Sequence, residues 1–131
     1  MRSRSQIYAE TIYAKVNSVS GIETGEKKRY GALCHRFAFI VRENGLAAAF
    51  GFLAAKGGPD AGSAEKRLLG HFAEVLGAAG AAALQQMVSR AGLAEYRRLT
   101  RQTLAANEWF KRYAEAILKV GPTGEEEDAH V

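Results

Sequence analysis

Apolar residues recur every three or four positions along most of this chain, a spacing that predicts amphipathic α-helices. No segment alternates apolar and polar residues for long, so no β-strand is expected. A first helix should begin near Ser3 or Ser5, either of which can cap it, and continue to about Val19 before Gly21. A second helix covers about residues 26–43, and its apolar face consists of Tyr30, Leu33, Cys34, Phe37, Ile40 and Val41.

The dipeptide Asn44–Gly45 predicts an abrupt end to the second helix, because glycine adopts a left-handed backbone conformation there at little cost. Apolar positions resume at Leu46, so a third helix must follow almost without a loop and pack on the same core. Two shorter helices are expected next, and Asp60 or Ser63 caps the first of them.

The last helix is predicted to be the longest, from about residue 93 to residue 120, where Gly121–Pro122 ends it. The expected fold class is therefore all-α, a compact bundle of about five to six helices with a long C-terminal helix. Residues 1–120 are expected to form one domain, and residues 121–131 an acidic, disordered tail.

Charge is distributed unevenly along the sequence. The 131 residues include 18 Lys and Arg and 14 Asp and Glu, for a net charge of +4. Four of the acids lie in the tail, at Glu125, Glu126, Glu127 and Asp128, which leaves a net charge of about +8 on residues 1–120. A basic body favours a polyanionic partner, most often nucleic acid, although such a surface can also serve only for solubility.

Candidate chemistry is sparse, which argues against an enzyme. HExxH, GxSxG and P-loop motifs are absent from the sequence, as is any grouping with metal-ligand spacing. The one cysteine, Cys34, excludes an intrachain disulfide and is expected to be a buried thiol in a reducing, cytoplasmic setting. No apolar run is long enough to span a membrane, and the N-terminus lacks the apolar core of a secretory signal. We therefore expect no catalysis, no metal and no cofactor.

Basic residues predict two candidate nucleic-acid-binding surfaces. On the last helix, Arg97, Arg101, Arg112 and Lys119 fall nearly opposite the core face, and guanidinium groups suit phosphate binding. The candidate set on this helix comprises Arg97, Arg98, Arg101, Lys111 and Arg112, with Arg90 added if the fifth helix continues with little bend. On the second helix the set comprises Lys27, Lys28, Arg29 and Arg42, with His35 on the same side. A solvated surface is the alternative interpretation of both sets.

Three aromatic residues lie off the predicted core faces and are candidate protein contacts. Phe39 lies among the cations of the second helix, which suits base stacking or a protein anchor. The alternative, burial of Phe39, is favoured because a central helix has neighbours on two sides. Trp109 and Tyr113 widen the apolar face of the last helix, either for a partner interface or for a broader core.

Three stretches of the sequence have a family resemblance. They are YAETIYAKVNSV, KKRYGALCHRFAFIVRENGLAAAFGFLAAK and LAEYRRLTRQTLAANEWFKRYAEAILK. The corner Asn44–Leu46 and the run Trp109–Tyr113 are their most recognisable parts. In these stretches the chain resembles the small α-helical subunit of the Cmr complex, the type III-B CRISPR effector that silences RNA. Residues 57–83 have little counterpart in that family, whose members often carry a proline near Ala38.

The resemblance implies a helical bundle without nuclease activity, stacked in several copies along the complex. The implied partners are other Cmr subunits, including the backbone nuclease subunit, copies of the chain itself, guide RNA and target RNA, with no membrane. The basic face would contact RNA phosphates without reading bases. Two alternatives remain open: an adaptor that docks an acidic protein, and a DNA-binding regulator, for which no clear recognition helix is found.

Overall fold

A computed structural model describes residues 1–123, and these form six α-helices and no β-strand. The helices are α1 (Arg4–Asn17), α2 (Thr24–Asn44), α3 (Leu46–Lys56), α4 (Ala64–Val75), α5 (Ala81–Arg90) and α6 (Leu93–Ala116). The predicted all-α class, number of helices and long last helix are confirmed. The acidic residues 125–128, predicted to be disordered, lie outside the described residues.

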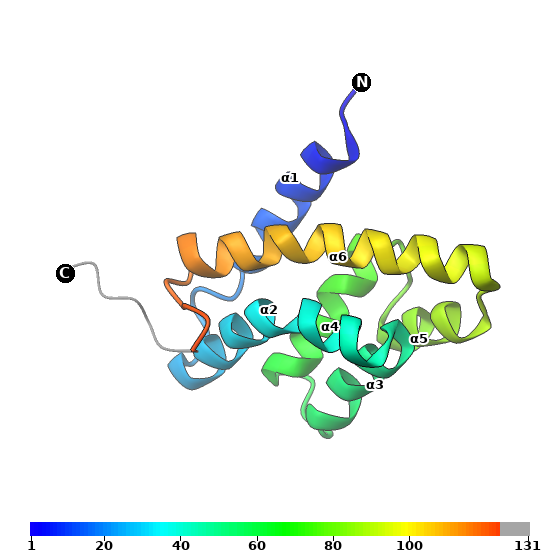
Figure 1. Ribbon diagram of the computed structural model, residues 1–131. Helices are drawn as coiled ribbons and strands as arrows, with labels where there is room; N and C mark the ends of the chain where they lie inside the picture. Colours follow the sequence, from blue (N-terminus) through cyan, green and yellow to red (C-terminus); the bar gives the residue numbers. More distant parts are fainter. Residues whose placement is uncertain (124–131) are drawn as a thin grey trace.

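The two longest helices, α2 and α6, lie side by side and antiparallel, while α1 crosses α6 steeply (Figure 1). The Asn107 side chain of α6 donates to the Cys34 carbonyl of α2 at 2.8 Å. Near the N-terminal end of α6, the Tyr96 hydroxyl accepts from the N–H of Ala47, which lies just beyond the end of α2. Within residues 1–123, none of the helices is both long and apolar enough to cross a membrane.

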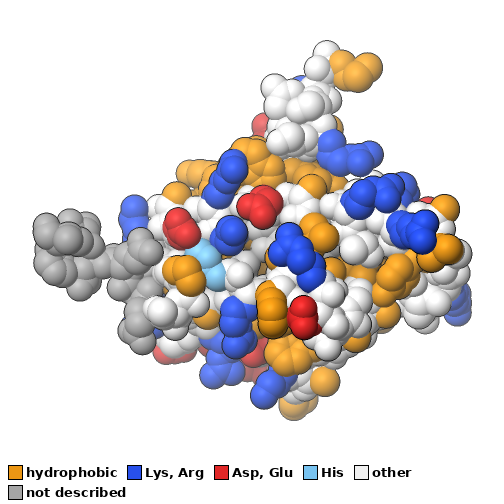
Figure 2. Space-filling view, viewed as in Figure 1, with side chains coloured by type: hydrophobic (Ala, Val, Ile, Leu, Met, Phe, Trp, Pro, Cys, Tyr) orange, Lys and Arg blue, Asp and Glu red, His pale blue; other side chains and the backbone are white. Residues whose placement is uncertain are grey.

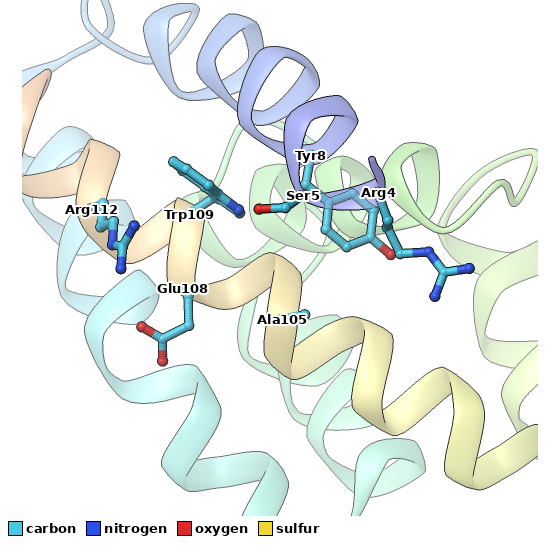
Figure 3. A pocket seen from close by; sticks show the side chains of 7 residues that line it. All are labelled: Arg4, Ser5, Tyr8, Ala105, Glu108, Trp109 and Arg112. Carbon is cyan, nitrogen blue, oxygen red and sulfur yellow. The ribbon is translucent and has the colours of Figure 1, made fainter. Parts of the chain in front are cut away.

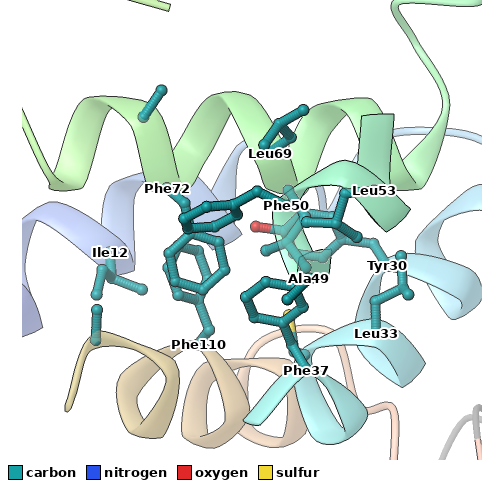
Figure 4. Packing of buried hydrophobic residues seen from close by; sticks show 14 of the residues in the cluster. Ile12, Tyr30, Leu33, Phe37, Ala49, Phe50, Leu53, Leu69, Phe72 and Phe110 are labelled. Carbon is teal, nitrogen blue, oxygen red and sulfur yellow. The ribbon is translucent and has the colours of Figure 1, made fainter. Parts of the chain in front are cut away.

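Phenylalanines from four helices form the centre of the core (Figure 4). Phe37 of α2, Phe50 of α3, Phe72 of α4 and Phe110 of α6 are fully buried. The ring centroids of Phe72 and Phe110 are 4.7 Å apart and those of Phe37 and Phe72 are 5.0 Å apart, both in tilted arrangements that aromatic pairs prefer. Phe37 belongs to the apolar face predicted for the second helix, so helical periodicity identified that part of the core.

The corner between α2 and α3 is a single residue. Gly45 has φ 89° and ψ 161°, so φ is positive as predicted, but ψ is extended and not left-handed helical. Its N–H donates to the Val41 carbonyl at 2.8 Å, and its carbonyl accepts from Ala49 at 3.0 Å. The N–H of Ala47, which α3 itself leaves unpaired, donates to the Tyr96 hydroxyl at 3.0 Å. A side chain of α6 thus caps α3.

Capping residues at the other helix starts refine the predicted boundaries. Ser3 caps α1 in a capping box with Gln6, and Ser63 rather than Asp60 caps α4. The first helix ends at Asn17, earlier than predicted, although Val19 in the following turn is fully buried.

The prediction that the last helix extends to residue 120 is wrong, since α6 ends at Ala116. Lys119 has φ 61°, which turns the chain back so that Val120 is buried against α2. A Cβ atom on Gly31 of α2 would lie only 2.5 Å from the Val120 Cβ, so glycine alone leaves room for this approach. A continuing helix could not bring Val120 to this position.

Candidate nucleic-acid interface

Exposed arginines on the N-terminal half of α6 form the most cationic part of the predicted surface. Arg97, Arg98 and Arg101, which we call the α6 arginine cluster, are all exposed. Arg98 pairs with Glu95 one turn earlier. Among the described residues, no carboxylate lies within ion-pair distance of Arg97 or Arg101. Figure 2 shows Lys and Arg side chains gathered over this half of α6 and along α2 on one face.

The C-terminal half of α6 is more nearly neutral, as the sequence predicted. Lys111 Nζ lies 3.8 Å from Glu108 Oε2, an exposed pair of small energetic value. The guanidinium of Arg112 lies over the Trp109 ring, 5.2 Å from its centroid. A cation–π contact of this kind holds the arginine in place while leaving its charge available.

A groove between α1 and α6 adjoins the α6 arginine cluster. One hollow of about 320 Å³ is lined by Arg4, Ser5, Tyr8, Ala105, Glu108, Trp109 and Arg112 (Figure 3). A second hollow of about 220 Å³ is lined by Arg4, Arg98, Arg101, Gln102 and Ala105. Because Arg4 and Ala105 line both hollows, the two are neighbours, and together we call them the α1–α6 groove.

Arg4 is a candidate site residue that the sequence did not reveal. It lies in the first turn of α1, more than ninety positions before Arg98 and Arg101, and only the crossing of α1 over α6 brings the three together. The chain shows no spacing pattern that connects residues so far apart. Tyr8 is buried, yet it also lines the groove.

The remaining predicted cations are scattered. Since His35 of α2 lies 3.8 Å from Glu115 of α6, the start of α2 lies beside the C-terminal end of α6. Lys27, Lys28 and Arg29 are therefore roughly 30 Å from the α6 arginine cluster, at 1.5 Å per helical residue. Arg29 also lies 3.8 Å from the buried Glu65. The ten predicted basic residues thus do not form one surface.

Two expectations about cations on neighbouring elements are wrong. Arg90 does not extend the α6 surface as a continuous helix, because extended backbone at Ala91 and Gly92 reverses the chain between α5 and α6 (Figure 1). His35 does not face solvent with Arg42, which is exposed. Its side chain is only 3% exposed, and its Nε2–H donates to the Val120 carbonyl at 2.9 Å. Because α6 ends at Ala116, the chain that follows turns back and covers the His35 side chain.

The three candidate aromatic residues differ in exposure. The favoured expectation that Phe39 is buried is wrong, because its side chain is 65% exposed on the outer side of α2. Trp109 and Tyr113 are partly buried against the core. Tyr113 also meets Tyr13 of α1 edge to face, with centroids 5.4 Å apart. This packing agrees with a broader core face on α6, widened to receive α1.

Buried polar groups in this protein serve the fold. The Tyr30 hydroxyl and Nδ1 of His71 are hydrogen-bonded at 2.6 Å. Burial lowers the pKa of His71 to about 4, so the imidazole is neutral at pH 7. Burial also raises the pKa of the Cys34 thiol, which leaves it unreactive. The described part of the chain contains no group of three or more His, Cys, Asp or Glu side chains able to hold a metal.

Comparisons with known proteins agree with this arrangement. The family described as CRISPR-associated protein (Cas_Cmr5) matches residues 4–117. The CRISPR system Cmr subunit Cmr5 of Thermus thermophilus is 38% identical over 120 residues, which cover 91% of this chain and 99% of that protein. The chain belongs to the Cmr5 family. A crystal structure of a Cmr5 family protein from Thermus thermophilus superimposes with a TM-score of 0.81 at 36% identity, covering 90% of this chain and 99% of that one.

The family resemblance recognised in the sequence is therefore confirmed. The region matched to the Cmr5 family extends from Arg4 to Ile117 and so includes both walls of the α1–α6 groove and the whole of the α6 arginine cluster.

Proposed function

We propose that this Cmr5 family protein is a non-catalytic small subunit of the type III-B CRISPR (Cmr) effector and that it contacts RNA through the α6 arginine cluster. Its partners would be other Cmr subunits, including the backbone nuclease subunit, further copies of itself, and guide and target RNA. The place of action would be the cytoplasm. Family membership supports the complex, and the exposure of Arg97 and Arg101 without carboxylate partners among residues 1–123 supports the RNA contact.

Electrostatics favours a backbone contact for this surface. Guanidinium groups present a planar set of donors that matches phosphate oxygens, and exposed arginines retain their full charge for such contacts. Contacts to phosphate position a protein on RNA without selecting a sequence. A subunit that must accept any guide and any target needs this kind of contact.

The salt dependence of RNA binding tests this contact. Replacing Arg97 and Arg101 by Gln removes two charges from exposed positions and should leave the fold intact. We plot the logarithm of the RNA association constant against the logarithm of the salt concentration. The magnitude of its negative slope should fall by about one for each arginine lost. Arg98→Gln should have a smaller effect, because Glu95 already neutralises Arg98. Lys56→Gln, a charge loss at the exposed end of α3, is the matched control.

An unchanged slope in the Arg97 and Arg101 variants would contradict the proposal. It would favour the second candidate function, an adaptor that docks an acidic protein partner through the basic surface. The exposed Phe39 on α2 supports that candidate, because large exposed aromatic residues often anchor protein interfaces.

A further inference from the structure

The two hollows of the α1–α6 groove differ in chemistry. The second hollow contains only cations and neutral groups, with Arg4, Arg98 and Arg101 around Gln102 and Ala105. The first hollow contains aromatic rings and groups of both hydrogen-bonding types, including the Glu108 carboxylate. A phosphate suits the second hollow, which holds three arginines and no carboxylate. The first hollow sets the Glu108 carboxylate beside Arg4 and Arg112 and adds aromatic rings and hydroxyl groups, so it differs from the second chiefly in its aromatic walls and its mixed donors and acceptors.

Polar groups in the first hollow lack partners within the protein. Among residues 1–123, the Ser5 hydroxyl, the Tyr8 hydroxyl and the Trp109 indole N–H make no hydrogen bond to another residue. Figure 3 shows the Trp109 nitrogen directed toward the Ser5 oxygen across the hollow. Burial raises the pKa of Tyr8, opposed by Arg4 and Arg98, so its hydroxyl keeps its proton and can donate.

These groups match the edge of a nucleobase better than they match a phosphate. The indole N–H and the hydroxyls can donate to base carbonyl and ring nitrogen atoms, and the Ser5 and Tyr8 hydroxyl oxygens can also accept from a base N–H. The aromatic walls from Tyr8 and Trp109 provide apolar contact for the flat ring. A hollow of about 320 Å³ lies within the size range of small-ligand sites.

From this arrangement we infer that the α1–α6 groove binds one unpaired nucleotide of single-stranded RNA. The base enters the hollow lined by Tyr8 and Trp109, and its phosphate lies on Arg4 and Arg101. This inference rests on the proposed RNA-contacting function and adds a preference for unpaired over paired nucleotides. A base in a duplex is engaged by its partner strand and cannot insert its edge between α1 and α6.

Trp109 is the one tryptophan of the chain, so its fluorescence reports on this groove alone. The full-length protein is titrated at low salt with a 12-nucleotide oligouridine, an abasic 12-nucleotide ribose-phosphate strand, and a 12-base-pair RNA duplex. We expect oligouridine to change Trp109 emission and to bind about tenfold tighter than the abasic strand, because one base contact gives a ratio of this order. The duplex should leave the emission unchanged.

Equal affinity for the oligouridine and the abasic strand, or an equal emission change with the duplex, would overturn the inference while leaving the backbone contact standing. Failure of all three RNAs to bind would contradict both the inference and the proposed function. Arg4→Ala should weaken oligouridine binding about fivefold or more. Arg2→Ala is the matched control, since Arg2 pairs with Glu10 outside the groove. Equal losses in the two variants would also overturn the inference.

Discussion

His71 shows what a single polar residue contributes to this fold. This residue of α4 is hydrogen-bonded to Tyr30 of α2. The ion pair between Lys15 of α1 and Glu74 of α4 lies beside it. Burial is the main cause of its lowered pKa, and the positive charge of Lys15 adds to the effect. No spacing in the sequence connects His71 with Tyr30, because 41 positions separate the two residues.

Acid should therefore destabilise the protein before its carboxylates titrate. The unfolded chain binds a proton at His71 near pH 6.5, whereas the folded chain does so near pH 4, so the unfolded state holds more protons in this window. We expect the free energy of unfolding to fall by about 2 kcal/mol between pH 7 and pH 5. Urea denaturation at both pH values measures the change. His71→Gln should remove most of it, and an undiminished fall in that variant would exclude His71 as the cause.

Boundaries between helices depend on both local and distant residues. Asn44–Gly45 marked its corner clearly, because the backbone requirement lies in the glycine itself. The end of α6 could not be predicted in the same way, since it depends on Gly31 admitting Val120 from 89 positions away. The cap of α3 by Tyr96 is likewise a contact between segments that lie far apart in the sequence.

Two glycine substitutions, one at the corner and one within α3, test the backbone requirement at Gly45. Gly45→Ala forces a side chain into a positive φ, with its Cβ 3.3 Å from the Tyr96 hydroxyl, and should cost about 1–3 kcal/mol of stability. Gly51→Ala, within α3 and with open space around the added Cβ, should instead stabilise by about 0.5–1 kcal/mol. Thermal unfolding of both variants gives the comparison. Equal shifts in melting temperature for the two variants would mean that the corner has no special backbone requirement.

Across the whole molecule, helical periodicity was enough to predict the fold class and the core, while the candidate site was predicted only in part. The exposed positions of Arg97, Arg98 and Arg101 follow from the phase of one helix. Arg4 does not, because its place beside them depends on the angle at which α1 crosses α6 (Figure 1). The cations at the start of α2 were predicted as a separate surface, and the antiparallel packing of α2 and α6 places them at the other end of the helix pair from the α6 arginine cluster.

Ultraviolet crosslinking in the native host tests the central claim most directly. The tagged chain is purified after irradiation, and peptides carrying crosslinked nucleotides are located by mass spectrometry. We predict that other Cmr subunits and RNA purify with it, and that crosslinks lie in α1 and the N-terminal half of α6. Purification with protein partners but without RNA, or crosslinks confined to α3, α4 and α5, would contradict an RNA contact through the α6 arginine cluster.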